Sequence, residues 1–298
     1  MSVSPVTVQE RRPERPPLTG REVALLTTLA MLCFAGNSLL CRLALRGGAI
    51  DASSFTAVRL GAAALMMGVL AQLGTRGRPH GGSWLSAVAL FGYAIAFSLA
   101  YVQIGAGIGA LLLFGAVQLT MIGWGLLKGE RPGATEWFGL ALALVGLLLL
   151  TNPSVSGSPA GGMALMLLAG VGWGTYSLRG RRAADPLQTT ATNFARTIPL
   201  VLPMVAISFL VERPHLSTTG VTAGLASGAV TSGIGYVIWY RALSRLTALQ
   251  AATVQLTVPV IAALGGVAFL GERITLRLLG AGALVLGGIA VVIFSRSR

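Results

Sequence analysis

Ten apolar blocks of about 17 to 25 residues, separated by short polar segments, make up most of this sequence. A helix of that length crosses the roughly 30 Å hydrocarbon layer of a bilayer. Strands of a membrane barrel alternate apolar and polar residues, whereas "WFGLALALVGLLLL" (137–150) is apolar at every position. We therefore predict an all-α membrane protein with ten transmembrane helices. The predicted spans are 23–45, 53–73, 84–104, 106–127, 135–151, 162–178, 187–211, 218–240, 247–270 and 275–294.

The composition fits this class, and the placement of charge predicts the orientation. Hydrophobic residues are 54% of the 298 residues, charged residues are 10%, and the mean hydropathy is +0.77, which is unusual for a soluble protein. With ten spans, fifteen Lys and Arg residues fall on the side of the N-terminus and five on the other. Since Lys and Arg collect in cytoplasmic loops, we predict a multi-pass protein of the bacterial inner membrane with both termini cytoplasmic. The net charge of +13 thus orients the chain, and we expect no nucleic-acid partner.

The N-terminal segment and the cysteines carry little chemistry. Residues 1–21 are rich in Pro and Arg, which predicts a disordered cytoplasmic tail. The apolar stretch that follows is longer than a signal-peptide core, so we expect a permanent first span. Cys33 and Cys41 lie in that same span, which gives neither a disulfide framework nor a metal-ligand spacing. We expect no metal and no cofactor.

The two halves of the sequence resemble each other at an offset near 140 residues. "FAGNSL" (34–39) matches "WGTYSL" (173–178), and "FTAVR" (55–59) matches "TNFAR" (192–196). The tripeptide Gly-Glu-Arg occurs at 129–131 and again at 271–273. Matches that keep their order predict an internal duplication. Because each half has five predicted helices, an odd number, the second copy must enter the membrane inverted, as in many secondary transporters.

The two Gly-Glu-Arg segments follow the fourth and ninth predicted spans. We expect the glycine to end the helix, the glutamate to lie near the N-terminus of the next helix, and the arginine to anchor at the lipid headgroups. The two copies would then lie on opposite faces of the membrane.

These features together resemble a known family. The sequence has ten predicted spans in two repeats, a Trp/Phe-small-x-x-Ser start in the first and sixth spans, an arginine in the second and seventh, and "GE" after the fourth and ninth. This combination is similar to EamA-type drug/metabolite transporters. Within that superfamily the chain is most similar to YddG-type bacterial exporters, which implies export of aromatic and other amino acids. The resemblance implies a first repeat at 22–152 and an inverted second repeat at 160–296. It also implies a cavity lined by the first four helices of each repeat.

The fifth and tenth predicted spans have almost no hydrogen-bonding side chains. "WFGLALALVGLLLL" (137–150) has only Trp137 at one edge, and "LLGAGALVLGGIAVVIF" (278–294) has none. Since such helices cannot hold a polar solute, we expect them to face lipid or a partner subunit, such as a second copy of the chain.

Acidic residues and histidines are confined to tails, loops and helix ends. All nine Asp and Glu residues and both histidines lie there, and no catalytic cluster falls within the spans, so we predict that the protein is not an enzyme. A proton-driven exporter usually has an ionisable carboxylate or histidine on its pathway. The related small multidrug pumps carry a glutamate in their first helix, and "MLCFAGNSLL" (31–40) has none. This favours facilitated export.

Two arginines, Arg59 and Arg196, lie inside predicted spans at matching repeat positions. An unpaired arginine in hydrocarbon costs at least about 2.5 kcal/mol, and no carboxylate lies within the spans to pair with either. A substrate carboxylate could bind the guanidinium fork. Alternatively, both arginines reach the interface or bond backbone carbonyls, and Arg59, about 9 Å from its helix end at 1.5 Å per residue, is the better placed to do so.

Other polar and aromatic side chains within the spans complete the set of candidate residues. A pocket that is mostly apolar with a few orienting hydrogen bonds suits a small solute, although amides and hydroxyls also join transmembrane helices to one another. The candidate substrate-binding residues are Asn37, Arg59, Tyr101, Gln118, Trp173, Tyr176, Asn193, Arg196, Tyr236, Trp239 and Gln255.

The sequence thus predicts a secondary transporter that exports neutral or aromatic amino acids, or similar small metabolites, by alternating access. Two alternatives stay open at this point. One is an exporter of other solutes, such as nucleosides or drugs, with proton coupling; the other is a membrane scaffold that transports nothing.

Overall fold

The computed structural model describes residues 19–74, 81–127, 129, 133–151, 159–180, 183, 185–211, 214–243, 245–246 and 254–295. Within these residues the structure is helical, with one isolated antiparallel bridge between Ile50 and Leu216. Most of the predicted tail (1–21), including everything before Thr19, lies outside the described residues. Among the described residues, six helices are long and apolar enough to cross a bilayer, and this part of the chain is that of an α-helical membrane protein.

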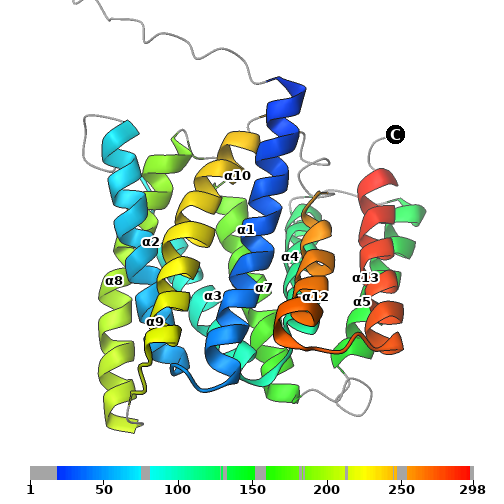
Figure 1. Ribbon diagram of the computed structural model, residues 1–298. Helices are drawn as coiled ribbons and strands as arrows, with labels where there is room; N and C mark the ends of the chain where they lie inside the picture. The colour runs from blue at the N-terminus through cyan, green and yellow to red at the C-terminus, as the bar shows by residue number, and fades with distance from the viewer. Residues whose placement is uncertain are drawn as a thin grey trace, which may run out of the picture.

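The described helices match most of the predicted spans. The first half contains α1 (Gly20–Arg46), α2 (Ala52–Gly74), α3 (Trp84–Gln103), α4 (Ala106–Leu127) and α5 (Ala134–Thr151). The second half contains α7 (Ala160–Gly180), α8 (Pro186–Val211), the continuous run α9 (Thr218–Leu225), η1 (Ala226–Ile234) and α10 (Gly235–Leu243), then α12 (Thr257–Leu270) and α13 (Leu276–Ser295). α1 begins and α13 ends at the same end of the bundle (Figure 1). We call it the termini end and the opposite one the far end.

Local sequence explains several of these helix boundaries. Thr19 and Glu22 form a capping box at the start of α1, and Ser83 caps α3 through the N–H of Ser86. Both glycines of the Gly-Glu-Arg segments have positive φ, 89° at Gly129 and 62° at Gly271, a conformation that L side chains rarely adopt. The expectation that these glycines end their helices is confirmed, while Glu130 and Arg131 lie outside the described residues.

The ninth span differs from its predicted bounds. We predicted 247–270, but α12 begins at Thr257, and 247–253 lie outside the described residues. Pro259 therefore lies in the first turn of α12. Proline destabilises a helix little there, because the backbone N–H that it lacks would have no partner within the helix.

Eight helices pack in a closed ring. Following the contacts around it, the order is α1, α10 with η1, α2, α8, α3, α7, α4, α12 and back to α1. The remaining helices, α5 and α13, pack on each other at one edge of the bundle, next to α4 (Figure 1). Their predicted peripheral position is confirmed.

Backbone contact at glycines holds α5 against α13. A Cβ at Gly288 would lie 2.5 Å from the carbonyl oxygen of Gly139, and a Cβ at Gly146 would lie 2.8 Å from the nitrogen of Val285. Glycines permit such close approach between transmembrane helices.

We expect Gly288→Val to separate α13 from α5, because the added side chain would overlap the α5 backbone. Overpacking of this kind costs about 1–3 kcal/mol, which a thermal melt in detergent would detect as a lower Tm. Gly287→Val is the matched control, since a Cβ at Gly287 meets no atom within 4 Å. Equal melting of the two variants would contradict the close contact.

The segment η1 is a nine-residue π-helix between α9 and α10. It packs on α2 at Gly228, where a Cβ would overlap the carbonyl oxygen of Arg59. Short π-helical segments inside α-helices occur frequently at functional sites. This one brings Ser227 and Thr231 to the centre of the ring.

Candidate functional site

A network of buried polar side chains joins four elements at the centre of the ring. The amide oxygen of Asn37 in α1 accepts hydrogen bonds from Ser227 (2.6 Å) and Thr231 (3.3 Å) in η1. Its amide nitrogen donates to the hydroxyl of Tyr93 in α3 at 3.4 Å. Arg59 in α2 donates to the same hydroxyl at 2.8 Å. The network therefore connects helices from both halves of the chain.

Arg59 is the charged centre of this network. It is 2% exposed, and its guanidinium lies 5.1 Å from the ring centre of Tyr93 and 4.9 Å from that of Phe97. Its Nη1 atom has no hydrogen-bond partner within the described part of the chain. The alternative that Arg59 reaches the membrane interface is contradicted, because α2 is packed between η1, α8 and α3 and this side chain is buried. A buried cation with an unused donor is suited to bind an anionic group.

An aromatic cluster lies beside the network. Phe34 makes edge contacts with Trp173 (6.3 Å between ring centres), Tyr236 (6.0 Å) and Trp239 (5.8 Å). Trp173 also contacts Tyr93 at 5.2 Å and Tyr236 at 5.1 Å. Phe34 and Trp173 occupy the matching positions of "FAGNSL" and "WGTYSL", so the two repeat segments meet at the centre.

The space between the network and the cluster is nearly closed. A cavity of about 20 Å³ is lined by Phe34, Asn37, Tyr93, Phe97, Trp173 and Tyr236, among others. That volume is close to the minimum that holds one water molecule. A larger solute therefore requires the aromatic side chains to move apart.

Most of the predicted residues lie in or beside this centre. Asn37, Arg59, Trp173, Tyr236 and Trp239 belong to it. Tyr176 contacts Trp173 at 5.6 Å, and Tyr101 packs edge-on against Phe97 at 4.7 Å.

Four predicted residues have other surroundings. Gln118 is buried in α4, and its Nε2 has no hydrogen-bond partner within the described ranges. Asn193 accepts a hydrogen bond from the N–H of Ser83 at 2.9 Å. Arg196 donates to the carbonyl of Gly81 at 3.4 Å and lies 6.0 Å from the ring centre of Trp84, so the structure places it at the start of α3. Gln255 is half-buried just before α12.

Sequence reasoning missed Phe34, Tyr93, Phe97, Ser227 and Thr231. Ser227 and Thr231 are four residues apart and share a helix face, and Phe34 begins a repeat motif, so these carried a signal. Tyr93 and Phe97 carried none, since aromatic residues in an apolar span are common.

An ion pair joins the two halves at the far end. Arg42 of α1 lies 3.3 Å from Glu272, between Nε and Oε1, and donates to the carbonyls of Tyr101 (2.7 Å) and Val102 (3.2 Å). The Glu272 carboxylate accepts from the N–H of Ala106, at 2.8 and 3.0 Å to its two oxygens. We expected Glu272 at the start of the helix that follows it, α13, but it caps α4. The N–H groups at the start of α4, which have no partner within that helix, attract the carboxylate, and Arg42 holds it there.

Comparison with known proteins identifies similar chains. The EamA-like transporter family matches residues 22–152 and 160–294. An uncharacterized protein of Pseudomonas aeruginosa is 53% identical over 93% of this chain and 96% of its own length. A probable amino-acid metabolite efflux pump of Salmonella typhimurium is 26% identical over 63% of this chain and 68% of its own.

Two further similarities extend the comparison. The threonine/homoserine exporter RhtA of Escherichia coli K12 is 31% identical over 54% of this chain and 55% of its own. A crystal structure that is 21% identical superposes with a TM-score of 0.67, over 94% of this chain and 100% of its own. That structure shares the fold.

Proposed function

The chain belongs to the EamA-like transporter family, and on this premise we propose that it exports neutral or aromatic amino acids across the bacterial inner membrane. As a member of that family it is a multi-pass membrane transporter with a small-molecule substrate rather than an enzyme. Two relatives are named for amino-acid export, which supports this substrate class.

We infer that residues 22–152 and 160–296 are two inverted five-helix repeats. The pattern of helix contacts supports this. Exchanging the halves pairs α1 with α7, α2 with α8, α3 with the run α9–η1–α10, α4 with α12, and α5 with α13. If the halves are equivalent, each contact between helices should have a counterpart after this exchange. The counterpart of α3–α7 is α10–α1, that of α4–α7 is α12–α1, and that of α3–α8 is η1–α2. All three counterparts occur. The α2–α8, α4–α12 and α5–α13 contacts are unchanged by it.

The single observation that carries the proposed substrate is the Nη1 of Arg59, which is buried and has no hydrogen-bond partner among the described residues. We propose that it binds the substrate carboxylate, while Asn37 orients the solute by hydrogen bonds. Phe34, Trp173, Tyr236 and Trp239 would then separate to enclose its side chain, since aromatic walls with few polar groups are typical of small-molecule pockets.

We propose that transport proceeds by alternating access and is facilitative. The far end is sealed by the Arg42–Glu272 pair, which connects the two halves and must break for that end to open. The described acidic residues, Glu22, Asp51, Glu136, Asp185 and Glu272, lie at helix ends or in loops. None of them lies within the central network, which supports transport without a carboxylate that binds and releases a proton.

Counterflow in liposomes tests this proposal. Liposomes that contain the purified protein and unlabelled phenylalanine should accumulate external labelled phenylalanine at equal pH on both sides. Unlabelled neutral amino acids should compete, and nucleosides and cationic dyes should not. Loss of counterflow at equal pH would contradict the facilitative mechanism, and competition by nucleosides or dyes alone would favour the alternative solutes.

A further inference from the structure

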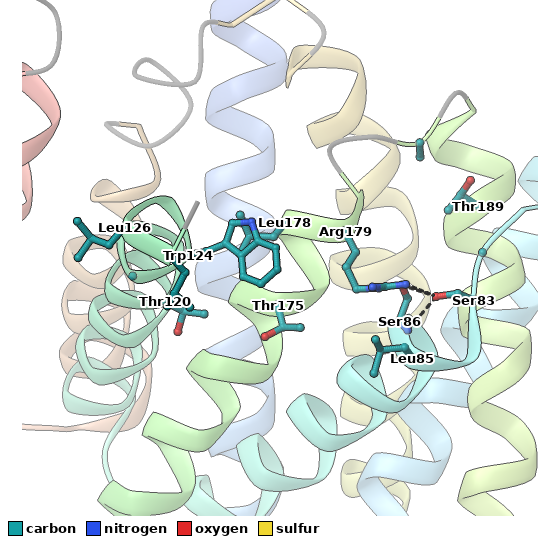
Figure 2. A pocket seen from close by; sticks show the side chains of 14 residues that line it. Ser83, Leu85, Ser86, Thr120, Trp124, Leu126, Thr175, Leu178, Arg179 and Thr189 are labelled. Carbon is teal, nitrogen blue, oxygen red and sulfur yellow. Dashed lines mark hydrogen bonds between the residues drawn. The ribbon is translucent and has the colours of Figure 1, made fainter. Parts of the chain in front are cut away.

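A large cavity lies outside the ring, at the termini end. It has a volume of about 1050 Å³ and lies between the start of α3 and the ends of α4 and α7, with one corner at α8 (Figure 2). Its lining includes Ser83 and Ser86 of α3, Thr120 and Trp124 of α4, and Thr175 and Arg179 of α7. We call it the outer groove.

The exposed face of α7 shows that the outer groove opens away from the centre. Residues three or four apart share a face of a helix. Leu168 (60% exposed) and Val171 (46% exposed) form one stripe of α7, and Thr175 and Arg179 continue it towards the termini end. Met166, Ala169, Trp173 and Tyr176 form the opposite, buried stripe. The groove therefore faces lipid, with α7 as its floor and α3 and α4 as its walls.

A cation is fixed at the headgroup end of this groove. Arg179 is the second-last residue of α7 and lies beside Ser83, the N-cap residue of α3, which is a helix long and apolar enough to cross a bilayer. Arg179 therefore lies at the level where α3 reaches the membrane interface. Its Nε donates to Ser86 at 2.9 Å and its Nη2 to Ser83 at 3.0 Å, as the dashed lines in Figure 2 show. Among the described residues, the ion pair present is Arg42–Glu272. Arg179 therefore has no described carboxylate that would neutralise its charge.

We propose that the outer groove binds an anionic phospholipid, with its phosphate on Arg179 and an acyl chain along α7. The rest of the guanidinium and the hydroxyl hydrogen of Ser86, whose oxygen accepts from Ser83 at 2.9 Å, supply donors for phosphate oxygens. Leu85, Trp124, Leu126, Leu127 and Leu178 supply apolar surface for the chain. Charge complementarity selects the occupant, because basic pockets between transmembrane helices on the cytoplasmic side bind anionic headgroups.

Native mass spectrometry of the delipidated protein tests this proposal. The protein would be incubated in micelles that contain equal amounts of dioleoyl phosphatidylglycerol and dioleoyl phosphatidylcholine, one of them deuterated. We expect the wild type to retain about five times more phosphatidylglycerol. Arg179→Gln should bring this ratio close to one. The matched control, Arg245→Gln, removes an exposed arginine outside the groove and should keep the wild-type ratio.

Two further experiments distinguish a bound lipid from other occupants of the groove. Thr175→Trp fills the floor of the groove and should reduce retention of both lipids, although Arg179 is intact. Excess glycerol 3-phosphate should displace neither lipid. A wild type without preference, or a preference that survives Arg179→Gln, would overturn the proposal. Displacement by glycerol 3-phosphate would instead indicate a soluble anion, and a dimer that Thr175→Trp dissociates would indicate a protein interface.

Discussion

Replacing Arg59 with methionine should reduce amino-acid counterflow at least about tenfold and leave the thermal stability unchanged or higher. A hydrogen bond to a charged group contributes about 1.5–3 kcal/mol, and each 1.4 kcal/mol is about tenfold in affinity. Methionine fills a similar volume but cannot bind a carboxylate. Stability should not fall, because an arginine within a spanning segment is costly to insert, by about 2.5–3.5 kcal/mol where it lies at the helix centre. Tyr93 also keeps its hydrogen bond from Asn37.

The opposite directions of the two effects make this prediction specific. Counterflow and thermal melts of the same preparation would measure both. A purely structural arginine would lower stability and transport together, and that outcome would contradict a substrate-binding role. Arg245→Met is the control, since it makes the same chemical change at an exposed position at the termini end.

Glu272→Gln should open the far end, and the buried thiol of Cys41 can report it. Cys41 is 0% exposed and precedes Arg42 in α1. Glutamine can still accept the Ala106 N–H but loses the charge that holds Arg42. In a Cys33→Ser background, we expect a neutral maleimide to label Cys41 about tenfold faster in the variant. A tenfold change corresponds to a loss of about 1.4 kcal/mol in the free energy that favours the closed far end over the open one.

Two further variants control this experiment. Glu22→Gln removes a carboxylate from the termini end and should leave the labelling rate unchanged. The double variant Arg42→Gln, Glu272→Gln should label no faster than the single one if the two side chains act as a pair. Equal rates in the wild type and Glu272→Gln would show that the pair does not hold this end closed.

The helices could be predicted well from the sequence because a spanning segment must satisfy its backbone hydrogen bonds internally and be apolar over a fixed length. α3 and α4 end within one residue of their predicted bounds. The start of α12 was predicted less well, since six of the ten residues before Thr257 are apolar, and hydropathy does not mark where such a helix begins. The π-helical turns of η1 were not predicted at all, because they depend on packing against α2.

The site could be predicted as a set of residues but not as an arrangement. Asn37, Arg59, Trp173 and Tyr236 were identified because polar and aromatic side chains in apolar spans are conspicuous. The sequence ordered Arg59 and Arg196, which occupy matching repeat positions, the wrong way: it favoured Arg59 for the interface, whereas Arg59 is buried at the centre and Arg196 bonds the carbonyl of Gly81. Their different surroundings follow from which side of α2 and of α8 faces the centre, and α2 is apolar on nearly every side.

The close contact between α5 and α13 has a consequence for how the protein is made. About 125 residues separate Thr151, at the end of α5, from Leu276, at the start of α13. At roughly 5–20 residues per second, about 6–25 s pass between the synthesis of α5 and that of α13, its main partner. During that time α5 must be stable alone in lipid. The absence of polar side chains from 138–150 is what permits this, and a polar substitution there would harm biogenesis before it could harm transport.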